Sequence, residues 1–228
     1  LVVEKEPVFG GTTAFSGGVL WIVGNPHCEG ARKDTREAAR RFLTNEIGAF
    51  FDAAGVDAFL DNAPRMVEWF ERETDVKFVS TLYPDYHPDV DGGVDVGRSI
   101  LAKPFDIRKL GAAMARLRPP LATITFMGMM FNSSNADLKH FFNATRSFTS
   151  FIYVARRLAA HMKELLLYRR AVQVTSGNAL AARLAKSTLD LGVPSWTSSP
   201  VKQLLGEDGE WLRSRGFAAL AINGDRTQ

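Results

Sequence analysis

The apolar residues of this chain follow two patterns, short runs near both ends and helical spacing in the middle. Near the start, residues 1–4 form an apolar run that ends in Glu4, and residues 19–23 form a second run. Residues 193–197 and 201–205 are two similar short segments near the other end. Short apolar segments bounded by Gly, Pro and Ser are typical of strands. We therefore expect four strands here, with the first one buried.

The middle of the chain is predicted to be helical. Asp34 and Glu37 resemble a capping box with Asp34 as the N-cap, and the apolar positions after them recur at helical spacing. A second helix over residues 57–74 is expected to be split at Pro64, because a helix interior tolerates proline poorly. Further helices are predicted over residues 106–116, 138–170 and 177–191. We expect the last of these helices to have Ser176 as its N-cap and Gly192 as its stop.

A long connection separates these helices. After a predicted short strand over residues 76–79, the segment from Thr81 to Pro104 is rich in Pro and Gly. Long segments of this kind are often functional loops. Strands at both ends and helices between them predict an α/β fold, in which a nucleotide-binding domain is interrupted by a helix-rich α+β insertion over residues 37–170.

Composition narrows the possible classes of protein. The chain has 228 residues, 46% of them hydrophobic, so it can bury a core and is not of a disordered type. A net charge of +3 allows anionic ligands but does not indicate nucleic acid. The lone Cys28 excludes an intrachain disulfide and is expected to be a packed or unreactive thiol. The longest apolar stretch, residues 121–131, is too short to cross a bilayer. We expect a cytoplasmic protein without an integral membrane segment.

The spacing of histidines does not suggest a metal site. The four histidines are His27, His87, His140 and His161. None is spaced from another as zinc ligands usually are, so we predict no metal. His87 lies in the Tyr- and Pro-rich segment and could be catalytic, but a structural or solvent-facing role is favoured.

The first strand and the segment after it carry the most informative chemistry. An acid at the end of a strand, such as Glu4, can accept hydrogen bonds from ribose hydroxyls of a dinucleotide. The Gly-rich segment from Gly10 to Gly18 follows closely, and glycines allow backbone amides to approach a pyrophosphate. Each feature alone is common, but their order and spacing are more specific.

Several motifs together resemble one family. The sequence from Glu4 to Gly18 is similar to the FAD-binding loop of the fumarate reductase and ketosteroid dehydrogenase superfamily. The middle of the chain narrows the resemblance to 3-ketosteroid Δ1-dehydrogenases. The motifs that carry it are Asp57 to Pro64, Tyr83 to Pro88, Gly97 to Ser99, Pro104 to Asp106, Gly177 to Leu180, and Leu191 to Pro194.

This resemblance implies a cofactor, a reaction and a set of site residues. It implies FAD, held by residues at the ribose, the pyrophosphate and the flavin. The implied cofactor-binding residues are Glu4, Lys5, Gly11, Thr12, Thr13, Ser16, Gly17, Gly18 and, through its backbone, Val201. The implied reaction removes two hydrogens from adjacent carbons of a ketosteroid A ring. A hydride goes to the flavin and a proton to a tyrosine base outside this chain, which Tyr86 would assist. The substrate would be an apolar, ketosteroid-like small molecule, and the electron acceptor stays open.

The chain also departs from the family pattern. It contains no Gly-x-Gly-x-x-Gly phosphate loop before Glu4, and residues 210–228 show no resemblance. We therefore expect a chain truncated at both ends. Residues 1–36 would be a partial Rossmann-like FAD-binding domain, residues 37–170 a catalytic cap, residues 171–209 the return to the FAD domain, and residues 210–228 a divergent tail.

Two alternatives stay open. A fumarate or succinate type flavin oxidoreductase on the same fold would need clustered Arg and His, and only Arg98 and His87 lie near the expected segment. A non-catalytic truncated remnant is the other alternative, supported by the missing phosphate loop.

Overall fold

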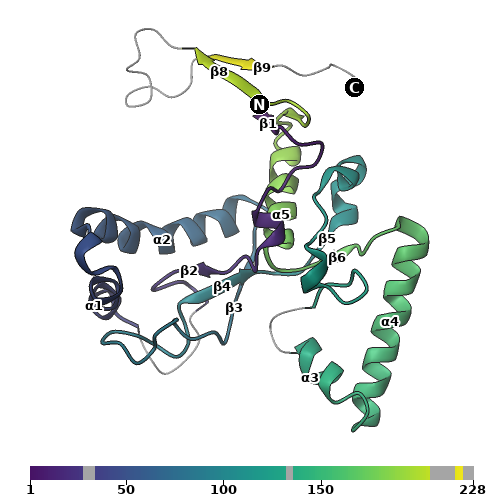
Figure 1. Cartoon of the computed structure of the whole chain (residues 1–228), viewed down its shortest axis with the longest axis horizontal. Coiled ribbons are helices and arrows are strands. Elements are labelled where there is room, and N and C mark those ends of the chain that lie inside the picture. The colour runs from purple at the N-terminus through teal and green to yellow at the C-terminus, as the bar shows by residue number, and fades with distance from the viewer. Residues whose placement is uncertain (28–33, 132–135, 206–218, 223–228) are drawn as a thin grey trace.

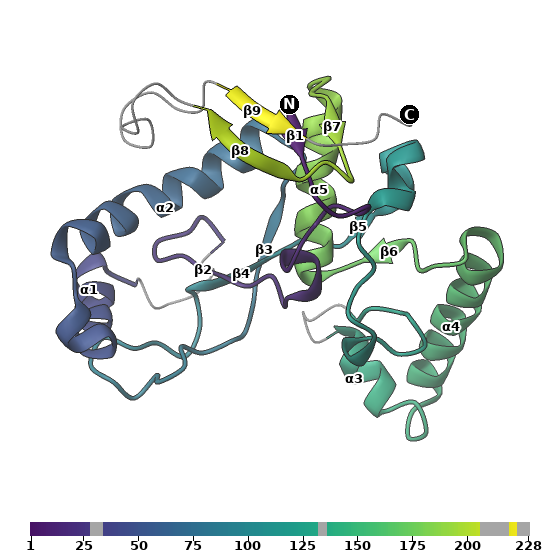
Figure 2. The ribbon, with the colours of Figure 1, turned by 45° about the horizontal axis from the view of Figure 1, so that its top comes forward.

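The computed structural model describes residues 1–27, 34–131, 136–205 and 219–222. The helix α5 (Ser176–Asp190) runs through the centre of the molecule. The pair α1 (Arg36–Ile47) and α2 (Ala53–Glu73) lies on one side of it. The pair α3 (Ala136–Phe142) and α4 (Phe148–Tyr168) lies on the other, as Figures 1 and 2 show. The mixture of helices and strands agrees with the predicted α/β character.

Within the described residues, the strands form four small sheets. The strands β2 (Leu20–Trp21), β4 (Ser99–Ala102) and β3 (Phe78–Ser80) make an antiparallel sheet in that order. The other three are pairs: parallel β1 (Val2–Val3) with β7 (Ser195–Trp196), antiparallel β5 (Phe105–Asp106) with β6 (Gln173–Val174), and antiparallel β8 (Val201–Leu205) with β9 (Ala219–Ile222). Both β2–β4 and β5–β6 pair a strand of the proposed insertion with a strand outside it.

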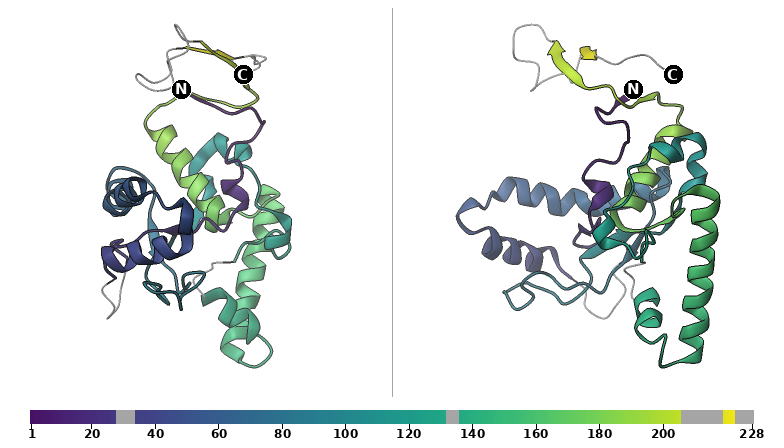
Figure 3. Two further views of the ribbon diagram at one scale, coloured as in Figure 1. Left: turned by 60° about the vertical axis from the view of Figure 1, so that its left-hand side comes forward. Right: turned by 45° about the vertical axis from the view of Figure 1, so that its right-hand side comes forward.

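The predicted terminal strands are confirmed, but the first is not buried. Val2 pairs with Ser195, and Val3 pairs with Trp196. Leu1 is 58% exposed and Val2 is 49% exposed, so the expectation of burial was wrong. β7 is the only strand paired with β1 in the described part of the chain, and one neighbour covers little of a strand. The N-terminus and the β8–β9 pair lie at the same end of the molecule (Figure 3).

Two predicted details of the first helices are wrong. The N-cap of α1 is Thr35, whose side chain accepts a hydrogen bond from the Ala38 amide, because the carboxylate of Asp34 pairs with Arg98 instead. Pro64 lies inside α2 without splitting it. Burial of the apolar face of α2, with Val67 fully buried, outweighs the local cost of the proline.

The predicted long loop contains a strand. Residues 99–102 form β4, the central strand of its sheet, and all four residues are buried. The expectation of irregular structure as far as Pro104 was therefore wrong. The run Ser-Ile-Leu-Ala is short, and the Gly and Pro residues around it hid its strand character.

The remaining helices also differ in detail. The segment η3 (Ile107–Arg116) is 3-10 helix, broken at Gly111 where φ is +56°. The predicted helix over 138–170 is two helices, α3 and α4. The C-terminal helix α5 starts one residue earlier than predicted, with Thr175 rather than Ser176 as the cap. Gly192 has φ +64°, as expected for a residue that ends a helix.

Candidate functional site

The Gly-rich segment folds into a tight loop against the start of α5. Gly10 and Gly18 have φ values of +114° and +66°, which side chains other than glycine rarely adopt. Between them, the 3-10 turn η1 (Thr13–Phe15) buries Ala14 completely. The Gly177 amide donates to the Ser16 carbonyl at 3.2 Å. A Cβ on Gly18 would lie 2.6 Å from Gly177 Cα, so the two backbones touch.

This loop presents unpaired backbone donors. The amides of Gly11, Thr12, Thr13 and Gly17 have no hydrogen-bond acceptor among the described residues. The Ser16 hydroxyl is used locally, donating to the Thr13 carbonyl at 2.9 Å and accepting from the Gly18 amide at 3.1 Å. A Cβ on Gly11 would meet nothing within 4 Å, so the space in front of it is open. Exposed amides beside open space suit phosphate oxygens.

Glu4 and this loop line one cavity. The cavity has a volume of about 250 Å³, and Glu4, Gly10 and Thr13 are among its lining residues. One carboxylate oxygen of Glu4 accepts from the Glu6 amide at 3.0 Å, and the other has no partner among the described residues. That oxygen is available to a hydroxyl donor. Lys5 is exposed and lies 3.8 Å from Glu6, so it does not line this cavity.

The backbone next to Val201 is tied to Glu4. The Ser199 amide donates to the Glu4 carbonyl at 2.8 Å, and the Ser198 amide donates to the Glu6 carbonyl at 2.9 Å. Val201 itself is 44% exposed and pairs with Ile222 of β9. Glu4 and the segment just before β8 are therefore neighbours, although almost 200 residues separate them in sequence.

Two arginines that the sequence did not single out lie beside the loop. Arg116 lines the same cavity as Glu4 and donates to the Ser195 carbonyl at 3.2 Å. Arg118 packs over the Phe15 ring at 5.1 Å, and its buried Nε has no hydrogen-bond partner among the described residues. The only sequence signal was two arginines on either side of an apolar residue, Leu117. The fold buries Leu117. Both charges suit an anionic cofactor.

Tyr86 lies in a different part of the molecule. Its side chain is 99% exposed, whereas its neighbour Asp85 is buried. Asp85 accepts hydrogen bonds from the Trp21 indole at 2.7 Å and from Arg98 at 2.8 Å. The side chain of Tyr86 thus projects into solvent, while the neighbouring residue Asp85 is held by buried hydrogen bonds.

His87, the next residue, pairs with α1. Its Nδ1 lies 2.9 Å from the Glu46 carboxylate. This hydrogen bond, with the negative charge of Glu46, raises the pKa of His87 above its ordinary value of 6.5. The protonated form is therefore favoured by the fold, and the pair's contribution to stability is complete below pH 6.5 and lost as the pH rises through the raised pKa.

Replacing Glu46 by Gln is expected to lower the pKa of His87 toward 6.5. Glutamine keeps the shape of the side chain but removes the negative charge that favours the imidazolium. An NMR titration of the His87 ring protons in the parent and variant proteins measures the change. Equal pKa values in the two proteins would show that the pair does not form in solution.

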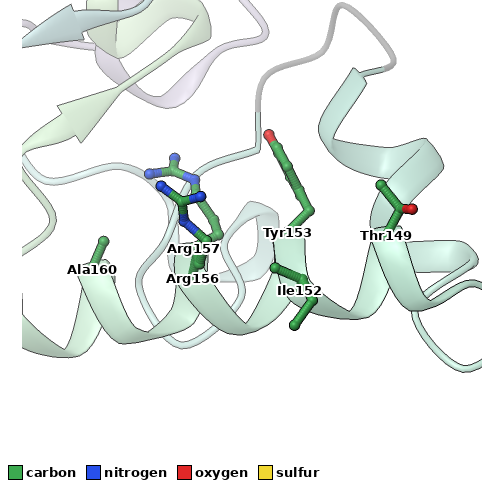
Figure 4. Close-up of a pocket in the computed structure, with 6 residues that line it drawn as sticks. All are labelled: Thr149, Ile152, Tyr153, Arg156, Arg157 and Ala160. Carbon is green, nitrogen blue, oxygen red and sulfur yellow. The ribbon is translucent and has the colours of Figure 1, made fainter.

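A second hollow lies along α4. It has a volume of about 550 Å³, and Figure 4 shows its lining. The guanidinium groups of Arg156 and Arg157 lie on the same side as the Tyr153 ring. Phe148 and Phe151 on this helix are 80% and 55% exposed. Neither Phe148 nor Phe151 is therefore part of a hydrophobic core.

The described segments hold neither a cluster of metal ligands nor a membrane-spanning helix. They contain no group of three or more His, Cys, Asp or Glu side chains that could hold a metal ion. In the same segments, no helix combines the length and the apolar character that a membrane span requires. Cys28 lies outside the described residues.

Glu4 at the end of β1 and the Gly-rich loop line one cavity, which is the arrangement expected of a nucleotide-binding protein. The family model described as FAD binding domain matches residues 1–227. The chain therefore belongs to the FAD binding domain family, and FAD is the cofactor that this membership indicates. The match includes the segment 210–227, so the domain limits given above stay a prediction.

Individual relatives narrow the family further. The 4-oxocyclohex-2-ene-1-carboxylate 5-dehydrogenase of Sinomonas cyclohexanicum is 42% identical over 211 residues, 92% of this chain and 35% of the relative. The 3-oxosteroid 1-dehydrogenase of Mycolicibacterium smegmatis is 32% identical over 217 residues, 93% of this chain and 37% of the relative. The chain thus spans about a third of the length of these curated relatives.

One solved structure has the same fold. The 3-ketosteroid Δ1-dehydrogenase of Sterolibacterium denitrificans, in complex with 1,4-androstadiene-3,17-dione, superposes with a TM-score of 0.83 at 27% identity. The superposition covers 99% of this chain and 40% of that one. The resemblance inferred from the motifs is confirmed.

Proposed function

We propose that this chain is part of an FAD-dependent dehydrogenase that removes hydrogen from two adjacent carbons next to a ring ketone. The proposal rests on the activities of two relatives, each of which matches more than nine tenths of this chain. Both curated relatives are dehydrogenases named for an oxo-substituted ring, one a steroid and one a cyclohexene carboxylate.

The chain's own residues support binding of FAD. Gly11 faces open space, and the unpaired amides of Thr12, Thr13 and Gly17 would donate hydrogen bonds to phosphate or flavin oxygens. The free carboxylate oxygen of Glu4 would accept a ribose hydroxyl. Ser16 and Gly18 would support the loop. Lys5 is proposed as a further contact to the cofactor, and the backbone of Val201 would contact the adenine. Bound FAD would supply the hydride acceptor for the reaction.

Tyr86 is the residue we assign to acid-base chemistry. A phenol has an ordinary pKa near 10, so a tyrosine base needs help to lose its proton. A second phenol that donates a hydrogen bond stabilises the phenolate. The exposed hydroxyl of Tyr86 would play that part for a tyrosine base outside this chain.

A steady-state assay with an artificial electron acceptor tests the proposal. The flavin-loaded protein that contains these 228 residues is given a 3-ketosteroid, 4-oxocyclohex-2-ene-1-carboxylate or succinate in separate reactions. We expect oxidation of a ring ketone and no oxidation of succinate. The relative at 42% identity favours the cyclohexene carboxylate as the second candidate substrate. Oxidation of succinate alone would make the fumarate or succinate alternative correct, and no oxidation by a flavin-loaded protein would support a non-catalytic remnant.

Replacing Glu4 by Gln is expected to weaken FAD binding by about 10- to 100-fold. The amide is a weaker acceptor for ribose hydroxyls and adds a donor that faces donors. Hydrogen bonds to charged groups contribute about 1.5–3 kcal/mol, which corresponds to that loss. Fluorescence titration with FAD measures it, with Glu6→Gln as the matched control, because Glu6 does not line the cavity. Equal affinities of the parent and Glu4→Gln would remove Glu4 from the site.

A further inference from the structure

The segment that carries Tyr86 is held at one buried point. Within residues 82–96, Asp85 is the single buried residue, at 5% exposure. Its backbone amide donates to the Val94 carbonyl at 3.0 Å, and its carboxylate accepts from the Val94 amide at 3.1 Å. Asp85 therefore links its own part of the segment to the part around Val94.

Arg98 connects this point to the rest of the fold. Its side chain is 1% exposed and donates to Asp85 at 2.8 Å, to both oxygens of Asp34 at 2.7 and 2.8 Å, and to the Gly92 carbonyl at 2.8 Å. The guanidinium also packs over the rings of Trp21 and Phe42, with centroids 5.3 and 5.5 Å away. Every charged atom of the network thus has a partner.

A buried ion network of this kind contributes little net stability to the fold. Removing an ion pair from water is unfavourable, and apolar residues of the same volume often stabilise a fold as well or better. What the network adds is fixed geometry, since a bidentate Arg–carboxylate pair tolerates little displacement.

The side chains next to the anchor point outward. Tyr86 is 99% exposed, Leu82 is 70% exposed and Tyr83 is 38% exposed. Tyr86 is thus displayed beside a rigid point, which is the arrangement expected of a residue that contacts a ligand.

We propose that Asp85 and Arg98 are positioning residues, which hold the backbone of Tyr86 so that its hydroxyl is placed for proton transfer. The inference rests on the proposed function, because Tyr86 has its acid-base role only there. A displacement of about 1 Å of a reacting group can cost roughly 100-fold in rate. Asp85 is adjacent to Tyr86, so loss of the anchor moves the phenol directly.

A double-mutant cycle tests this in the flavin-loaded protein that contains the chain. Asp85→Asn keeps the shape but cannot accept from Trp21, Arg98 and Val94 as a carboxylate does. We expect it to lower kcat by about 10- to 100-fold with little change in KM or FAD content. In the Tyr86→Phe background, Asp85→Asn should lower kcat less than about threefold, because residues that act as one unit are not additive.

Two further variants separate positioning from folding. Asp89→Asn removes an exposed charge of the same segment and should leave kcat unchanged. Trp21→Phe removes only the indole donor to Asp85 and keeps an aromatic ring over Arg98, so it covers the case in which Asp85→Asn fails to fold. Trp21→Phe should lower kcat severalfold, again only when Tyr86 is present, and should speed amide hydrogen exchange over residues 81–96.

The possible failures are distinguishable. If Tyr86→Phe alone keeps normal turnover, the acid-base role of Tyr86 is wrong and the inference falls with it. If Tyr86→Phe loses turnover but the Asp85 or Trp21 variants lower kcat equally with and without the Tyr86 hydroxyl, the positioning role alone is overturned. Unchanged hydrogen exchange over residues 81–96 in Trp21→Phe would also overturn it.

Discussion

Replacing Tyr86 by Phe is expected to lower turnover on a ring ketone by about 10²- to 10⁴-fold, the usual loss when an acid-base group is removed. The variant keeps the aromatic ring and deletes the hydroxyl that would stabilise a neighbouring phenolate. Because the side chain is 99% exposed, the fold should not depend on that hydroxyl. Stopped-flow reduction of the flavin by substrate measures the step directly, without dependence on the electron acceptor.

The matched control for this prediction is Tyr83→Phe. Tyr83 lies in the same segment and is also exposed, but it lies on the other side of the buried Asp85. We expect near-normal turnover from the control, and unchanged FAD content and melting temperature from both variants. If Tyr86→Phe keeps more than about a third of parental turnover, an acid-base role is excluded.

Replacing Gly177 by Ala is expected to lower the free energy of unfolding by about 3 kcal/mol, the upper end for overpacking of a rigid site. A Cβ at this position would overlap the carbonyl oxygen of Thr13 and lie 2.6 Å from the Ser16 hydroxyl. The backbone of Thr13 and Ser16 on one side and of α5 on the other cannot move apart without separating the Gly-rich loop from α5. Chemical denaturation of this 228-residue chain measures the effect without any cofactor.

Gly17→Ala is the control for Gly177→Ala. It changes a glycine of the same loop, but its Cβ would meet only Val19, at 4.0 Å, and its backbone does not have a positive φ that excludes alanine. We expect a change of less than about 1 kcal/mol, as for surface substitutions generally. An equally small change for Gly177→Ala would mean that the loop does not pack on α5 in solution.

The order of local features was readable from the sequence because it depends on residues close to one another. The strand before Glu4, the Gly-rich segment, and the start and stop of α5 were predicted to within one or two residues. The positive φ values of Gly18 and Gly192 agree with this. Short-range patterns work here because side-chain periodicity and the freedom of glycine act within a few residues.

Errors arose where a distant partner outweighed a local preference. Asp34 has the sequence context of an N-cap, but Arg98, 64 residues away, takes both of its carboxylate oxygens, and Thr35 caps the helix instead. Pro64 stays inside α2 because the buried face of that helix is held by packing. The strand β4 was hidden among Gly and Pro, yet it is the centre of a sheet.

The sequence by itself determined the class of this protein, because an acid after a strand, a Gly-rich loop and a set of family motifs are all contiguous features. Only the tertiary structure decided which residues meet. In the fold, Arg116 and Arg118 lie beside the Gly-rich loop. The Gly177 amide donates to Ser16, and Asp85 is buried in contact with Arg98. These contacts depend on how packed elements bring distant segments together. Periodicity shows that a face is buried, but it does not say what covers that face.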